Sequence, residues 1–263
     1  MEISLRGRAA VITGGSKGLG LAMARRFAAS GADVAILARG QAALEAAAEE
    51  IRAAAREAGT QGRVVAVACD VATAGGIQAG HDGAMAALGR IDIVVNNAGI
   101  SRTGAFETVT DAIWQEDLDL KLFAAIRLTR LVWPQLRERG WGRVINVLNT
   151  GAKAPRAGSA PTAVSRAAGL ALTKILAGEG APHGILVNAL LVGLIESDQW
   201  RRRAEAAGQP LEALLAEMGR GVPLGRVGRA EEFARTACFL ASDAASYITG
   251  TAINVDGGSC PIT

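Results

Sequence analysis

The sequence predicts an α/β fold in which helices cover both faces of a parallel sheet. Short apolar runs, bounded by glycines or polar residues, alternate with helical patterns along the whole chain. Strands that are separated by helices of ten or more residues form βαβ units, which build parallel sheets. Half of the 263 residues are hydrophobic and 33 are glycine, whereas aromatic residues make up only 4%. This composition supports a large buried core in which small side chains let the helices pack closely on the sheet.

The first elements show the pattern that the rest of the chain repeats. The run Ala9–Thr13 is apolar and stops at glycines, as a buried strand does. The segment Gly18–Ser30 places its apolar residues on one side of a helix and is followed by Gly31. On the same grounds we predict strands at Asp33–Ala38, Arg63–Cys69, Ile91–Asn96, Arg143–Leu148, Ile185–Leu190 and Ala252–Val255. The other predicted helices are Gln41–Ala58, Gly75–Leu88, Asp111–Arg139 with a kink at Pro134, Pro161–Gly180 and Glu231–Leu240.

Residues 193–229 interrupt this alternation after the sixth predicted strand. The segment is polar and contains a Gly-Gln-Pro sequence at 208–210. We interpret it as a small helical flap over a substrate site, and a surface insertion without a role is the alternative. The sequence contains no internal repeat and no low-complexity linker, so residues 1–263 are predicted to form a single domain.

Charge and cysteine content exclude several classes of protein. The net charge of +3 is small and scattered, whereas nucleic-acid binding favours clustered cations with stacking aromatic residues. Cys69, Cys238 and Cys260 are widely spaced and match no metal-binding pattern, which favours a reduced, cytoplasmic setting. The longest apolar stretch, 185–195, is about half of a membrane span. We therefore expect no metal site, no nucleic-acid partner and no membrane partner.

A glycine-rich turn links the first strand to the first helix. Glycines let the backbone approach a pyrophosphate closely, and the N-terminus of the helix offers free N–H groups and a partial positive charge. In a βαβ unit near the start of a chain, this pattern predicts a Rossmann-type dinucleotide site. A tight turn without a ligand is the alternative. The predicted binding residues in the turn are Gly14, Ser16, Lys17, Gly18, Leu19 and Gly20.

The end of the second strand predicts which dinucleotide binds. Enzymes that prefer NAD usually carry an acidic residue there, which holds the ribose hydroxyls. Here Ala38 and Arg39 occupy the strand end, and Lys17 in the glycine turn can reach the same region. Two cations without a carboxylate suit a 2′-phosphate. The sequence thus predicts NADP(H) in preference to NAD(H), and the alternative is that both cations are merely solvated.

Six motifs in order resemble the short-chain dehydrogenase/reductase family over essentially the whole chain. They are TGGSKGLG at 13–20, CDV at 69–71, NNAG at 96–99, GRVINV at 142–147, HGILVNALLVG at 183–193 and YITGTAINVDGG at 247–258. The resemblance implies a small carbonyl or alcohol substrate and a homotetramer or homodimer. It further implies adenine contacts from Asp70 and Val71, ribose contacts from Asn97, Ala98 and Gly99, and carboxamide contacts from Ile195 and Ser197.

The family's catalytic positions are all changed in this sequence. The resemblance places Asn149 at the family's Ser, Thr162 at its Tyr, Arg166 at its Lys and Asp119 at its Asn. A threonine hydroxyl is far too weak an acid to replace a phenol, and a guanidinium keeps its proton. We predict that Asn149 hydrogen-bonds the carbonyl, that Arg166 binds the ribose, and that Asp119 and Arg166 form an ion pair.

The sequence therefore predicts an NADP(H)-dependent oxidoreductase with an atypical active site. Water, the substrate or a carboxylate of Glu196 or Asp198 is then the proton source. One alternative is a cofactor-binding sensor or partner protein without turnover. Another is a non-redox enzyme that reuses the same pocket.

Overall fold

The computed structural model describes residues 3–262, apart from the side chains of residues 198, 199 and 202. Its centre is a seven-stranded sheet in the order β3-β2-β1-β4-β6-β8-β9, and every neighbouring pair of these strands is parallel. This doubly wound α/β arrangement confirms the predicted fold class. The strands are β1 (Ala9–Thr13), β2 (Asp33–Ala38), β3 (Val64–Ala68), β4 (Ile93–Asn96), β6 (Gly142–Asn149), β8 (Ile185–Val192) and β9 (Ala252–Val255).

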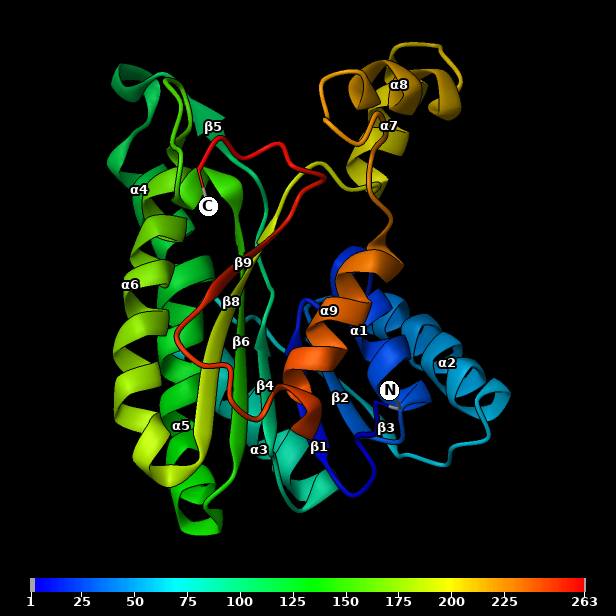
Figure 1. The fold of residues 1–263 in the computed structure, drawn as a ribbon, viewed down its shortest axis with the longest axis vertical. Coiled ribbons are helices and arrows are strands. Elements are labelled where there is room, and N and C mark those ends of the chain that lie inside the picture. Colours follow the sequence, from blue (N-terminus) through cyan, green and yellow to red (C-terminus); the bar gives the residue numbers. More distant parts are fainter. Residues whose placement is uncertain (1–2, 263) are drawn as a thin grey trace.

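Helices cover both faces of the sheet, as Figure 1 shows. One face carries α1 (Gly18–Ala29), α2 (Gln41–Glu57) and α9 (Ala230–Ala241). The other carries α3 (Ala74–Leu88), α5 (Ala124–Arg139) and α6 (Thr162–Gly180). The predicted helix over 111–139 consists of α4 (Asp111–Leu118), a π-helical turn η2 (Asp119–Phe123) and α5, and Pro134 lies inside α5.

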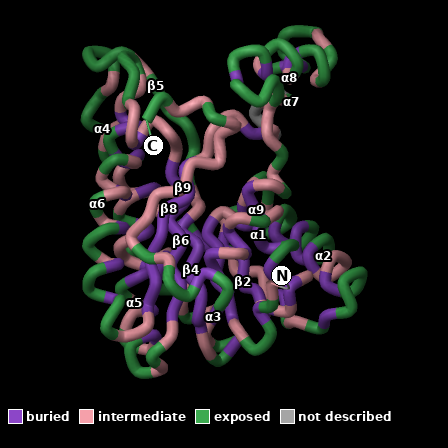
Figure 2. The backbone as a smooth tube through the Cα atoms, viewed as in Figure 1, coloured by how far each residue is buried: buried purple, intermediate pink, exposed green. Residues whose placement is uncertain are grey.

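Two apolar clusters fill the space between the sheet and its helices. Alternate residues of β1 point to opposite faces, so Ile12 joins the cluster beneath α1 and Val11 joins the one beneath α3 and α5. Phe27 of α1 and Phe233 of α9 are fully buried in the first cluster. Figure 2 shows the buried residues concentrated along the central strands. Many of the buried residues in these clusters are alanines.

Two features lie at the carboxyl ends of the strands, at the top of Figure 1. A two-stranded antiparallel sheet joins β5 (Thr103–Gly104) to β7 (Ala160–Pro161), and the sequence analysis did not predict it. The segment predicted as a flap forms two short helices, α7 (Asp198–Ala206) and α8 (Leu211–Gly219). β5 and β7 bring the start of α6 close to the loop that follows β4, and this proximity shapes the site described below.

Candidate cofactor and catalytic site

The strand order reverses between β1 and β4, and open α/β sheets bind their ligands at such a point. The glycine turn follows β1, and the segment beginning at Asn97 follows β4. The Thr13 hydroxyl accepts hydrogen bonds from the backbone N–H groups of Asn97 (2.9 Å) and Ala98 (3.0 Å). The Asn97 side-chain amide donates to the Thr13 carbonyl oxygen at 2.9 Å. These contacts fix the two loops against each other at this point of the sheet edge.

The glycine turn has the shape that a pyrophosphate cradle requires. Gly14 and Gly18 adopt φ values of +65° and +54°, in the left-handed region that favours glycine. A Cβ at Gly20 would lie 2.1 Å from the Gly14 carbonyl oxygen, so only glycine fits there. A Cβ at Gly18 would meet nothing within 4 Å, so this side of the turn is open. The first N–H groups of a helix such as α1 have no intrahelical partner and are available to a ligand. The turn therefore fits a dinucleotide phosphate.

The predicted 2′-phosphate residues lie beside this turn. Lys17 and Arg39 are exposed, and neither forms an ion pair with another described residue. The one acidic residue of β2, Asp33, lies at the other end of the strand and pairs with Arg63 at 2.6 Å. Among the described residues no carboxylate thus occupies the end of β2, where it would repel a phosphate.

The remaining predicted cofactor residues lie along the same edge of the sheet. Asp70 is exposed just after β3, and Val71 beside it is buried. Ile195 is buried after β8, where its backbone carbonyl accepts a hydrogen bond from the Trp200 indole at 2.9 Å. Ser197 precedes α7. The Asp198 side chain lies outside the described residues. These positions all follow the carboxyl ends of β3 and β8.

Three of the four predicted catalytic residues lie where β6 and α6 meet the crevice. Asn149 ends β6, and its Oδ1 atom is buried without a hydrogen-bond partner in the described part of the chain. Thr162 begins α6, and Arg166 lies one turn later. Arg166 donates to the Val147 carbonyl oxygen at 2.9 Å. A Cβ at Gly99 would lie 2.4 Å from Arg166 Nη2, so the guanidinium packs directly on the segment predicted to line the ribose.

The predicted ion pair between Asp119 and Arg166 is wrong. Asp119 instead contacts Arg127 at 3.0 Å and accepts a hydrogen bond from Gln115 at 2.7 Å. Residues two apart in a helix point in nearly opposite directions, because each residue turns by about 100°. The residue that faces α6 is therefore Lys121, two positions further along the chain. The predicted role of Asp119 in the site fails for this geometric reason.

The sequence analysis missed Lys121 and Asp117, which form an ion pair inside the site. Both side chains are only 1% exposed. The Lys121 ammonium donates to Asp117 and, at 2.8 Å, to the Thr162 hydroxyl. The Ser165 hydroxyl donates to the other Asp117 oxygen at 2.6 Å. One sequence signal could have found the pair: 117 and 121 are one helical turn apart and continue the stripe of Ala125, which is buried.

The electrostatics of this cluster favour the loss of a proton from the lysine. Burial lowers the pKa of Lys121 to about 8, although the hydrogen bond to Asp117 raises it. The nearby charges of Arg166 and Arg102 lower that pKa further. Burial also lowers the pKa of Arg166, to about 10. Lys121 is thus the group in this cluster whose proton is most readily exchanged near neutral pH.

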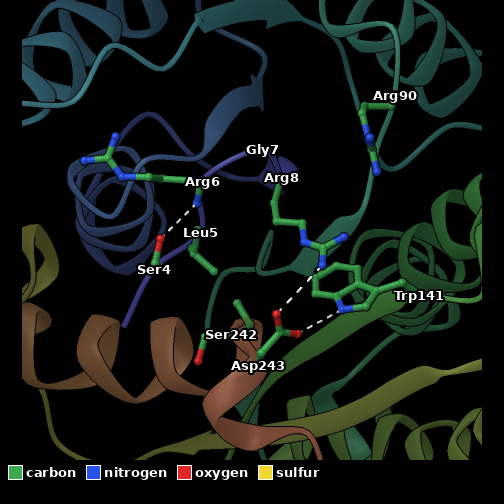
Figure 3. A pocket seen from close by; sticks show the side chains of 10 residues that line it. Ser4, Leu5, Arg6, Gly7, Arg8, Arg90, Trp141, Ser242 and Asp243 are labelled. Carbon is green, nitrogen blue, oxygen red and sulfur yellow. Dashed lines mark hydrogen bonds and ion pairs between the residues drawn. The ribbon is translucent and has the colours of Figure 1, made fainter. Parts of the chain in front are cut away.

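A cavity near the amino ends of the strands is lined by charged and aromatic side chains. Arg8, Trp141 and Asp243 line it, as Figure 3 shows. The Trp141 indole donates to Asp243 at 3.0 Å, and the Arg8 guanidinium lies 3.6 Å from the centre of the Trp141 ring. Arg143 contacts the same ring at 4.1 Å. These contacts hold the segment before β1 against the start of β6, at the edge of the sheet opposite to the glycine turn.

Comparisons with known proteins agree on a single family. A family model described as enoyl-(acyl carrier protein) reductase matches residues 14–260. The acetoacetyl-CoA reductase of Rhizobium meliloti is 35% identical over 95% of this chain and 98% of its own length. The structure of L-sorbose reductase from Gluconobacter frateurii, complexed with NADPH and L-sorbose, matches with a TM-score of 0.92, 34% identity and 100% coverage of both chains.

A further solved structure resembles this chain in the same way. It is an NADPH-bound short-chain oxidoreductase from Pseudomonas aeruginosa that is described as containing an atypical catalytic center. The match has a TM-score of 0.91 and 38% identity, and it covers 99% of each chain. In residues 3–262 of the present structure, no helix has the length and apolar character needed to span a membrane.

Proposed function

Because this chain belongs to the short-chain dehydrogenase/reductase family, we propose that it is an NADP(H)-dependent oxidoreductase with an atypical active site. It would interconvert a small carbonyl compound and the corresponding alcohol. The observation that carries the proposal is the open glycine turn flanked by Lys17 and Arg39, with no carboxylate at the described end of β2. The NADPH in two similar solved structures supports the same cofactor.

Each part of the cofactor has a set of residues that suits it. The glycine turn would hold the pyrophosphate, and Lys17 and Arg39 would bind the 2′-phosphate. Asp70 and Val71 would contact the adenine, and the segment 97–99 together with Arg166 would hold the nicotinamide ribose. Ile195 and Ser197 would bind the carboxamide. When bound, the cofactor supplies the hydride for the reduction.

The substrate would lie beside Asn149, beneath the flap of residues 193–229. The Asn149 amide group can donate a hydrogen bond to a carbonyl oxygen and stabilise the negative charge that develops on it. The names of the relatives suggest ketoses and 3-ketoacyl thioesters as the first compounds to examine. We further propose a cytoplasmic homotetramer or homodimer, in line with the family resemblance.

Fluorescence titration with NADPH and NADH, followed by a panel of carbonyl compounds, tests the proposal. We expect NADPH to bind at least about tenfold more tightly, since two charge-assisted contacts are worth more than 1.4 kcal/mol. We also expect at least one ketose or ketoacyl thioester to oxidise NADPH. Equal affinity for both cofactors would refute the NADP(H) preference, and binding without any turnover would refute the enzymatic role.

A cofactor-binding protein without turnover is the second candidate. It is favoured by the Thr162 hydroxyl, which already donates to the Arg102 carbonyl oxygen at 2.6 Å. Combining Asn149→Ser, Thr162→Tyr and Arg166→Lys restores three of the family's four residue types. Turnover that appears only in this combined variant would support the second candidate, and turnover in the unaltered chain would exclude it.

A further inference from the structure

We propose that Lys121 is the proton donor for carbonyl reduction, that the Thr162 hydroxyl relays the proton, and that Asp117 positions the ammonium. This inference rests on the proposed function and adds the one component that the altered family positions lack. Thr162 occupies the position of the family's catalytic tyrosine but cannot itself act as an acid near neutral pH. A second group must therefore return a proton to its hydroxyl.

Lys121 contacts that hydroxyl directly. The Lys121 ammonium donates to Thr162 Oγ1 at 2.8 Å and to Asp117 Oδ1, which itself lies 3.5 Å from Thr162 Oγ1. The Thr162 hydroxyl donates to the Arg102 carbonyl oxygen at 2.6 Å and accepts from the Arg102 backbone N–H at 3.2 Å. A rotation of the Thr162 O–H bond would turn this proton from Arg102 towards a substrate oxygen in the crevice.

The charges around Lys121 favour proton donation. Asp117 is the anion that contacts it, Arg166 and Arg102 are the nearby cations, and Ser165 and Thr162 are neutral. Arg102 is itself paired with Glu116 at the surface. Lys121 and Arg166 thus share one buried carboxylate, and the loss of a proton from Lys121 leaves one cation and one anion. The proton that leaves neutralises the negative charge that develops on the substrate oxygen.

The step balances in atoms and electrons. The bound NADPH would supply the hydride that forms a C–H bond at the carbonyl carbon, so that the carbonyl is reduced as NADPH is oxidised to NADP⁺, and the electron pair of the C=O π bond would move to oxygen. That oxygen takes the proton of the Thr162 hydroxyl, and Thr162 Oγ1 takes a proton from Lys121 at the same time. Lys121 becomes a neutral amine, and solvent returns its proton after the product leaves. Alcohol oxidation follows the same path in reverse, with neutral Lys121 as the base.

Other groups in the described part of the site serve this role poorly. Arg166 holds its proton more strongly than Lys121, and a side-chain amide such as that of Asn149 is not an acid. The only tyrosine of the chain, Tyr247, is fully exposed next to β9. Lys121 is the cation that donates to the Thr162 hydroxyl, and its pKa of about 8 suits a donor at neutral pH.

The pH dependence of NADPH oxidation is the first test. A donor must be protonated, so the reductive rate should be level below a pH of about 8 and fall about tenfold per unit above it. Lys121→Arg keeps the cation beside Asp117 but does not release a proton near neutral pH. We expect this variant to lose about 100-fold or more of the reductive rate while it binds NADPH as before. Lys174→Arg, at an exposed position of helix α6, is the matched control.

The relay through the hydroxyl has its own test. Thr162→Ser keeps a hydroxyl beside Lys121 and should retain most of the activity, whereas Thr162→Ala should lose it. Equal activity of the serine and alanine variants would overturn the relay.

A spectroscopic titration supplies a readout that needs no turnover. NMR of ¹³C-labelled lysine side chains should show one signal that titrates near pH 8, well below the usual value of about 10.4. This signal should be absent from Lys121→Met and present in Lys174→Arg. If Lys121→Arg keeps the full rate and the same pH profile, the proton-donor proposal is wrong although the proposed function stands. If the unaltered chain binds NADPH but reduces no carbonyl compound, the proposed function fails first and the donor proposal fails with it.

Discussion

Asp117→Asn is expected to destabilise the protein strongly although it changes only one atom. The substitution leaves Lys121 charged, 1% exposed at its side chain and close to a second cation, Arg166. Removing one partner of a buried ion pair costs about 3–5 kcal/mol, because the other charge loses its compensation. The Ser165 hydroxyl can still donate to the amide oxygen that replaces the carboxylate, which places the expected loss near the lower end of this range.

Urea unfolding at fixed protein concentration measures this loss of stability. The pKa of Lys121 predicts how the loss changes with pH. The lowered pKa of Lys121 means that the unfolded chain binds more protons than the folded one between pH 8 and 10. Stability therefore rises with pH in that window. Without Asp117 the pKa falls further, because the interaction that raises it is gone. The defect of Asp117→Asn should thus be largest near pH 6 and shrink by pH 9.

A double-mutant cycle decides whether the ion pair is the cause. Adding Lys121→Met removes the stranded charge, so the double variant should be more stable than the sum of the single effects by about 2–3 kcal/mol. Asp119→Asn is the matched control, because the Asp119 side chain is 26% exposed and should contribute less than about 1 kcal/mol. Additive effects of Asp117→Asn and Lys121→Met, or equal losses from the two Asp variants, would refute the reasoning.

Three further predictions concern the cofactor. Gly20→Ala places a Cβ 2.1 Å from a carbonyl oxygen of the glycine turn, so it should weaken NADPH binding at least about tenfold in the fluorescence titration. Gly178→Ala is the control, because its Cβ would meet nothing within 4 Å and the affinity for NADPH should stay unchanged. Arg39→Asp should reverse the preference towards NADH, measured as the ratio of the two dissociation constants, since a carboxylate repels the 2′-phosphate and can hold a free ribose; an unchanged ratio would contradict this. Gly99→Ala places a Cβ 2.4 Å from the end of the Arg166 side chain, so Arg166 should move and the NADPH dissociation constant should rise about tenfold, while the urea midpoint changes little.

The fold was predictable because its signals are local. The strand β1 and the glycine turn show their character within twelve residues, 9–20, through an apolar run, a stop and glycines at positions that need them. The π-helical turn at 119–123 and the pairing of β5 with β7 have no such local signal. β5 and β7 are only two residues long and lie more than fifty residues apart, so their pairing depends on tertiary structure.

The candidate site was predictable only in its cofactor half. Phosphate binding depends on backbone shape, which the glycines reveal, whereas the catalytic half depends on which side of a helix each residue occupies. Choosing Asp119 instead of Lys121 as the site residue of this helix was an error of two residues, and it exchanged a partly exposed face of the helix for the buried one. The buried stripe through Asp117, Lys121, Ala125, Leu128 and Val132 would have corrected the assignment.

A crystal structure of the chain with NADPH would test the central claim most directly, through the distance from Thr162 Oγ1 to the space in front of the nicotinamide ring. We expect the 2′-phosphate to lie between Lys17 and Arg39. We also expect a substrate carbonyl at hydride-transfer distance from the ring to fit within about 3 Å of Thr162 Oγ1, with Lys121 still bonded behind it. A nicotinamide ring on the far side of Arg166, separated from Thr162 and Lys121, would contradict the account.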